Sequence, residues 1–95
     1  MERCTITICG IVQGVGFRPF VYKLATRLGL AGFVQNQTGS VLIEAEGEPL
    51  VLERFRNELA ERPPPLAFIE RFSWQNQIPR GERQFRIVSS ESDAA

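Results

Sequence analysis

Residues 10–18 read Gly-Ile-Val-Gln-Gly-Val-Gly-Phe-Arg and constrain the fold more than any other part of the chain. They follow an alternating, strand-like run and precede Pro19, a residue that suits the first turn of a helix. Closely spaced glycines at such a junction let backbone N–H groups converge where the helix N-terminus favours negative charge. Arg18 adds a planar, permanently charged group that can bind a phosphate through two hydrogen bonds. The segment therefore predicts an anion-binding loop.

The alternative is that these glycines only let the chain turn tightly, and their spacing leaves both interpretations open. The charge pattern favours the anion, because the stretch between Arg3 and Ile43 contains no Asp or Glu. Its cationic residues are Arg3, Arg18, Lys23 and Arg27. The formal net charge of zero thus hides an anion-attracting first half and an acidic remainder.

The length of 95 residues fits one domain, which we expect at residues 1–90, followed by a disordered tail or the start of a linker at 91–95. No apolar run approaches the roughly 20 residues of a membrane span, and the first residues do not resemble a signal peptide. A cytoplasmic protein without membrane contact is therefore expected. Net neutrality argues against broad nucleic-acid binding, which needs clustered cations.

The two cysteines, Cys4 and Cys9, fall on opposite faces of one predicted strand, so they cannot pair with each other and are expected to be reduced. The chain has no histidine and no Cys-x-x-Cys pair. We therefore expect no zinc site.

Periodicity and turn residues predict strands at 4–12, 32–36, 41–46, 68–78 and 85–88, and helices at 19–28 and 49–62. Arg18 is expected just outside the first helix, because a residue before proline avoids the α region. The order β-α-β-β-α-β, with one additional strand segment, predicts an α+β, ferredoxin-like sandwich. In that fold two helices cover one face of an antiparallel sheet.

Two groups of residues are interpreted as structural. The aromatic residues expected in the core are Phe17, Phe20, Phe33 and Phe55. The acidic residues expected to form a solvated strand end, and not a metal site, are Glu44, Glu46 and Glu48.

Asn36 is the second candidate site residue, because it ends a predicted strand just before a glycine turn. Its carboxamide can donate and accept at once, which would let it orient a water molecule. The alternative, a turn residue that satisfies local backbone groups, is favoured by the sequence alone. The first half of the chain offers no His, Asp or Glu as a general base. Hydrolysis here would depend on positioning and electrostatic stabilisation, and would suit a substrate with a good leaving group.

The loop, together with Gly-Phe-Val-Gln-Asn at 32–36 and Val41, resembles the signature of the acylphosphatase family over almost the whole chain. The resemblance implies a ferredoxin-like hydrolase domain that binds acyl phosphates and inorganic phosphate, without a metal or another cofactor. It implies that Arg18 is catalytic and binds phosphate, and that Asn36 is catalytic and holds the attacking water. The implied phosphate-binding residues are Gln13, Gly14, Val15, Gly16, Phe17 and Arg18.

The string Gly-Val-Gly-Phe-Arg-Pro-Phe-Val, with Pro-Pro-Pro-Leu at 63–66, is similar to the N-terminal domain of the HypF carbamoyltransferases of NiFe-hydrogenase maturation. This resemblance implies carbamoyl phosphate as the substrate, and the remaining HypF domains and HypE as partners. The chain stops before any zinc-finger cysteines, so we expect an excised N-terminal domain that is a poorer catalyst than the longer chain. The alternatives are a stand-alone acylphosphatase and a non-catalytic ferredoxin-like module that binds an anion or a partner domain.

Two further expectations concern single positions. Ser40 stands where such sequences usually have glycine, and it would be strained if a positive φ were needed there, unless Gly39 makes the turn. Phe20 and Val21 project about 100° apart on a helix, so both cannot point into the core. One of them is expected to line the rim of the anion site or to face an adjoining domain.

Overall fold

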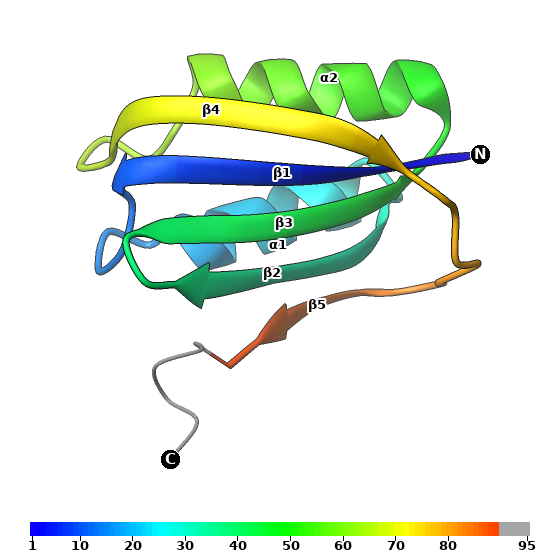
Figure 1. Cartoon of the computed structure of the whole chain (residues 1–95), viewed down its shortest axis with the longest axis horizontal. Helices are drawn as coiled ribbons and strands as arrows, with labels where there is room; N and C mark the ends of the chain where they lie inside the picture. Colours follow the sequence, from blue (N-terminus) through cyan, green and yellow to red (C-terminus); the bar gives the residue numbers. More distant parts are fainter. Residues whose placement is uncertain (90–95) are drawn as a thin grey trace.

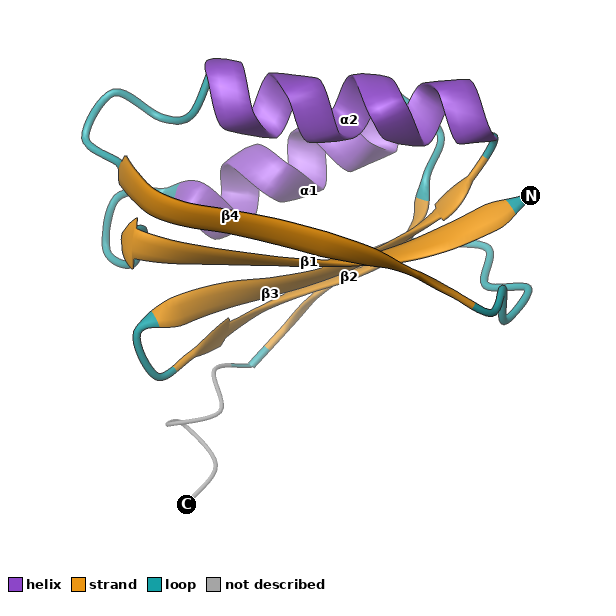
Figure 2. Ribbon diagram, turned by 45° about the horizontal axis from the view of Figure 1, so that its top comes forward, coloured by secondary structure: helices purple, strands orange, loops and turns teal. Residues whose placement is uncertain are grey.

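The computed structural model describes residues 1–89, which form one five-stranded sheet and two helices on one face of it (Figures 1 and 2). The helices are α1 (Phe17–Arg27) and α2 (Pro49–Glu61). The strands are β1 (Glu2–Ile11), β2 (Ala31–Gln37), β3 (Ser40–Gly47), β4 (Phe68–Gln77) and β5 (Phe85–Val88). The expected tail at 91–95 and the last residue of the expected domain lie outside the described residues.

The strand order is β4-β1-β3-β2-β5, with β1 antiparallel to β3 and β4, and β2 antiparallel to β3. This arrangement confirms the ferredoxin-like sandwich. One edge differs from the expected antiparallel sheet, because β5 pairs parallel to β2. After β4 the chain crosses the end of the sheet that is remote from the β2–β3 turn (Figure 1). It therefore meets the free edge of β2 while running in the same direction.

The core lies between the sheet and the helices, and Ile6 and Ile8 of β1 are fully buried there. Phe17 and Phe55 are core residues as expected, and Phe20 packs against the core while partly buried. Phe33 does not belong to this core, which corrects the sequence-based interpretation. Its neighbour Val34 occupies the core side of β2, and successive strand residues point to opposite faces.

Helix α1 begins at Phe17, after Gly16 with φ 79°, so Arg18 lies inside the first helical turn and not before it. Pro19 is tolerated in this first turn after Arg18. The first N–H groups of a helix have no intrahelical acceptor, so the backbone N–H that proline lacks is not needed. Val21 is fully buried, whereas Phe20 is partly buried. The residue that does not point into the core centre is therefore Phe20.

The face of the sheet opposite the helices carries a buried ion cluster of Arg3, Glu44, Glu46 and Glu82. Arg3 is fully buried and lies 2.8 Å from Glu44, 3.1 Å from Glu46 and 3.3 Å from Glu82. The Glu46 carboxylate also accepts the backbone N–H groups of Arg80 at 2.6 Å and Gly81 at 2.7 Å.

The interpretation of the three glutamates as a solvated strand end is thus wrong for Glu46, which is 2% exposed. The β4–β5 connection folds over it and supplies backbone donors, whereas the sequence shows only a charged residue at an alternating position. Glu48 is exposed as expected.

The turn between β2 and β3 is made by Gly39, whose φ is 73°, and no non-glycine residue among 1–89 has a positive φ. Ser40 is therefore unstrained. Both cysteines are free thiols, as expected; burial raises the pKa of the Cys4 thiol. Within the described residues, no helix is long and apolar enough to cross a membrane, and no group of His, Cys, Asp and Glu is arranged to hold a metal.

Candidate active site

The β1–α1 loop and the β2–β3 turn lie at the same end of the sheet (Figure 1). Between them is a pocket of about 240 Å³ that joins the glycine loop to Asn36 of β2. This volume is below the usual range of pockets for drug-sized ligands, roughly 300–1,000 Å³. The pocket is lined by Val12, Gly14, Gly16, Phe17, Arg18, Pro19 and Asn36.

The loop backbone takes its shape from two glycines in the left-handed region, Gly14 with φ 74° and Gly16 with φ 79°. A Cβ atom at either position would meet no atom within 4 Å, so the requirement for glycine is conformational and not steric. The first hydrogen bond of α1 runs from Phe20 N to Gly16 O at 3.2 Å. The N–H groups of Phe17 and Arg18 therefore precede the intrahelical bonds and are free to bind a ligand.

The electrostatics of this helix start suit an anion. No acidic residue lies in the first turn of α1, and no side chain caps it. Arg18 is half-buried and lines the pocket. The ion pairs among residues 1–89 involve Arg3, Arg27 and Arg86, and no carboxylate of these residues lies within 4.0 Å of the Arg18 guanidinium. The positive charge of Arg18 is thus not neutralised by the described part of the chain.

Asn36 lies on the core side of β2, opposite Val41 of β3, and is 9% exposed. Its Oδ1 is buried and has no hydrogen-bond partner among residues 1–89. A buried acceptor left unpaired costs about 1–3 kcal/mol, so a water or ligand donor in the pocket would satisfy it. Because β2 continues through Gln37, Asn36 is a strand residue, and this oxygen does not satisfy the turn backbone.

The structure separates the predicted site residues into two groups. The pocket brings together Gly14, Gly16, Phe17, Arg18 and Asn36. Gln13 and Val15 do not line it: the Gln13 side chain binds the β2–β3 turn, and Val15 packs against the core.

Sequence reasoning missed the apolar wall of the pocket, which Val12 and Pro19 provide. The sequence feature that could have identified them is their position on either side of the glycine loop. None of the lining residues is His, Asp or Glu, so the pocket can bind and orient a substrate but offers no side-chain general base of the usual kind.

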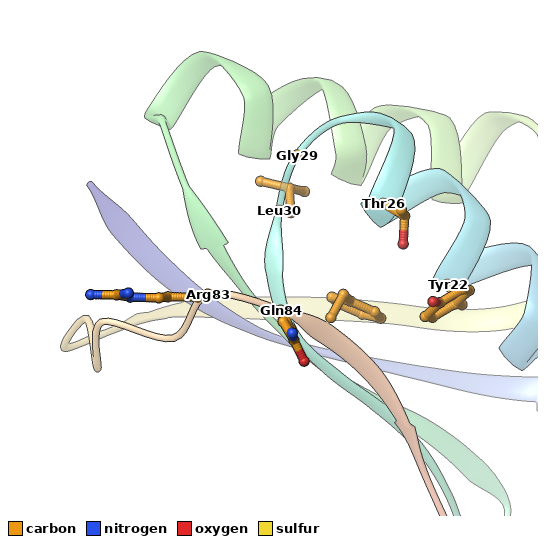
Figure 3. Close-up of a pocket in the computed structure, with 7 residues that line it drawn as sticks. Tyr22, Thr26, Gly29, Leu30, Arg83 and Gln84 are labelled. Carbon is orange, nitrogen blue, oxygen red and sulfur yellow. The ribbon is translucent and has the colours of Figure 1, made fainter.

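A second and larger cavity, of about 440 Å³, lies between the C-terminal half of α1 and the start of β5 (Figure 3). Tyr22 and Thr26 form one side of it, and the Arg83 side chain points away from them in Figure 3. This cavity contains no buried unpaired polar atom of the described chain. The smaller loop pocket, with its uncapped helix start and unpaired Asn36 oxygen, is therefore the candidate active site.

The chain is similar to known proteins in sequence and fold. The model of the family described as acylphosphatase matches residues 4–87. The chain is 44% identical over 88 residues to an acylphosphatase from Thermotoga petrophila, a match that covers 92% of this chain and 97% of that one. It is also 45% identical over 95 residues to the carbamoyltransferase HypF2 of Cupriavidus necator, covering 98% of this chain and 12% of that protein.

A solved structure shares the fold as well. A full-length HypF in its phosphate- and nucleotide-bound form superposes with a TM-score of 0.90 at 38% identity, over 95% of this chain and 12% of that one. The chain thus spans about the whole length of the acylphosphatase relative but only 12% of the length of the carbamoyltransferase relatives.

Proposed function

This chain belongs to the acylphosphatase family and is a hydrolase domain of that family, and we propose that it hydrolyses carbamoyl phosphate to carbamate and phosphate. In this proposal the loop N–H groups and Arg18 bind the phosphoryl group, and Asn36 holds the attacking water. The observation that carries it is the unpaired, buried Oδ1 of Asn36 in the same pocket as the guanidinium of Arg18.

The proposed reaction needs no acid or base residue in the pocket. The water oxygen forms a bond to phosphorus, while the bond between phosphorus and the acyl oxygen breaks and its electron pair leaves with the carboxylate. A carboxylate is a good leaving group because its conjugate acid has a pKa of only about 4. The proton of the water passes to the released phosphate or to solvent. Arg18 and the helix start stabilise the negative charge on the phosphoryl oxygens, which is the main protein contribution to such transfers.

Carbamoyl phosphate is proposed as the substrate for two reasons. Relatives named carbamoyltransferase match nearly the whole chain, and the pocket is small, which suits a compact acyl group. In a longer protein of that kind the remaining domains would adenylate the carbamate with ATP, which releases pyrophosphate, and would transfer the carbamoyl group to HypE with release of AMP, in the cytoplasm. Phe20, partly buried beside Phe17 with ring centroids 5.9 Å apart, is then the residue proposed to face a neighbouring domain.

A second candidate is a general acylphosphatase without a dedicated acyl group. It is favoured by the stand-alone relative from Thermotoga petrophila, 97% of whose length is matched. The two candidates share the site and differ in which acyl phosphate is preferred.

The test compares turnover of carbamoyl phosphate and benzoyl phosphate by this chain and by a longer HypF-type chain in one buffer. We expect hydrolysis of carbamoyl phosphate by both proteins, slower per site in the short chain, and loss of it in Asn36→Ala. Equal turnover in the two proteins together with a preference for benzoyl phosphate would support the general acylphosphatase instead.

A further inference from the structure

The side chain of Gln13 connects the anion-binding loop to the hairpin that carries Asn36. Its Nε2 donates to the carbonyl oxygen of Ser40 at 3.0 Å and to the carbonyl oxygen of Gln37. A glutamine carboxamide has two N–H donors, so the β2–β3 turn uses both. Binding of phosphate by Gln13 can therefore involve only its backbone N–H.

These hydrogen bonds lie next to both halves of the pocket. Gln37 and Ser40 form the last opposed pair of β2 and β3, and Asn36 directly precedes Gln37. At the other end, Gln13 directly precedes Gly14, which lines the pocket. The Gln13 side chain thus connects the start of the glycine loop to Gln37, the residue that follows Asn36.

Regular sheet pairing does not make this connection. The ladder between β1 and β3 ends with Cys9 opposite Ser40, and beyond it β1 pairs only with β4. Among residues 1–89, the bonds of Gln13 are the only side-chain or irregular backbone hydrogen bonds between residues 12–16 and residues 37–40. Without them no side-chain or irregular backbone hydrogen bond of the described residues would join the loop to the turn.

We propose that Gln13 is a positioning residue, which sets the separation of the anion loop from Asn36 and thereby orients the attacking water. This inference rests on the proposed function. In this proposal the Gln13 side chain touches neither the substrate nor the water, because both of its N–H donors bind the turn. Because a misplacement of about 1 Å can reduce a rate about a hundredfold, we expect Gln13→Ala to lower kcat between about tenfold and a hundredfold. The affinity for inorganic phosphate should stay within about twofold, since Arg18 and the loop backbone are intact.

The experiment measures kcat on benzoyl phosphate and the phosphate Kd of the wild type, Gln13→Ala and Asn36→Ala, with Gln13→Asn as a second, shorter carboxamide. Gln35→Ala is the matched control. Gln35 lies on β2 beside Asn36, and its side chain also donates to a backbone carbonyl, that of Ser89 at 3.0 Å, but away from the pocket. We expect slow turnover in both Gln13 variants and wild-type turnover in Gln35→Ala. Wild-type turnover in Gln13→Ala, or an equal loss in the control, would overturn the proposal.

The double variant Gln13→Ala/Asn36→Ala tests whether Gln13 acts through Asn36. If it does, the double variant is no slower than Asn36→Ala alone, because coupled residues are not additive. Losses that multiply would show that Gln13 acts by another route.

A readout that does not need turnover separates this inference from the proposed function. The side-chain amide signals of Asn36 in the NMR spectrum of the phosphate-saturated protein should shift and broaden in Gln13→Ala but not in Gln35→Ala. Unchanged signals would refute the positioning role even in an active enzyme. An inactive wild type with these shifts would refute the proposed hydrolysis and leave the positioning of Asn36 by Gln13 established.

Discussion

Arg3 and Glu46 face each other across β1 and β3, with Nη1 of the guanidinium 3.1 Å from Oε1 of the carboxylate, and both are almost completely buried. They lie on the face of the sheet that the helices do not cover. The carboxylate also holds the β4–β5 connection through the N–H groups of Arg80 and Gly81. This pair therefore anchors the segment that delivers β5 to the edge of β2.

The first prediction follows from that anchoring role. Glu46→Gln removes the charge that pairs with buried Arg3, and we expect the free energy of unfolding to fall by about 1–3 kcal/mol, the usual effect of losing a buried, charge-assisted hydrogen bond. Urea unfolding monitored by far-UV circular dichroism measures the change. Glu70→Gln, on the exposed part of β4, is the control and should stay within about 0.5 kcal/mol of the wild type.

The pH dependence of stability gives a second prediction. The pKa of Glu46 lies below its ordinary value, chiefly because the backbone N–H of Arg80 binds the charged form, with further contributions from Arg3 and Gly81 that outweigh burial. A carboxyl group of this kind stabilises the fold above its unfolded pKa of about 4.3, and the contribution disappears as pH falls through the folded pKa. The stability difference between the wild type and Glu46→Gln should thus be full near pH 6 and shrink below about pH 4. A difference that is constant with pH would contradict this account.

The third prediction concerns the anion. Arg18→Ala should weaken binding of inorganic phosphate at least tenfold, because each charge-assisted hydrogen bond contributes about 1.5–3 kcal/mol. Isothermal titration calorimetry gives the Kd directly. Lys23→Ala removes an exposed cation from the same helix and controls for long-range attraction. If both variants bound phosphate like the wild type, Arg18 would not be an anion ligand.

The fourth prediction separates phosphate binding from water positioning. Asn36→Ala should lower kcat on benzoyl phosphate by at least tenfold with little change in the Kd of inorganic phosphate, because its interaction is made chiefly in the transition state. Asn76→Ala, an exposed asparagine on β4, is the control. Wild-type turnover in Asn36→Ala would reduce Asn36 to a structural residue.

The fifth prediction tests whether the loop backbone itself binds the anion. Gly16→Ala forces a side chain into the left-handed region at a cost of about 1–2 kcal/mol, and the relaxing loop should lose phosphate affinity. Gly29→Ala is a matched control, since Gly29 has a φ of 72° and equally open surroundings but lies at the other end of α1. We expect Gly16→Ala and Gly29→Ala to lose similar amounts of stability. Only Gly16→Ala should lose phosphate affinity. A similar affinity loss in both variants would point to general destabilisation.

Much of the fold and of the candidate site could be predicted from local patterns. The alternation of Ile6 and Ile8 predicted one face of β1 in the core, and the glycine spacing predicted a loop before α1, in which Gly14 and Gly16 have positive φ. The start of α1 was misplaced, because the local preference of a residue before proline is weaker than the folded context that draws Arg18 into the first turn.

The sequence by itself determined the element order and the glycine loop with Arg18 at its end, because backbone preference and hydrophobic period act over a few residues. The placement of Asn36 in the same pocket as this loop depends on the tertiary structure. Only the tertiary structure decided the burial of Glu46, the position of Phe33 outside the core, the parallel pairing of β5 and the turn contacts of Gln13. The burial of Glu46, the pairing of β5 and the contacts of Gln13 each depend on a partner distant in the chain: the Gln13 side chain, for example, reaches a carbonyl 27 residues away. A local sequence pattern shows the chemistry of one residue, whereas the distant residue that it contacts is determined only when the chain folds.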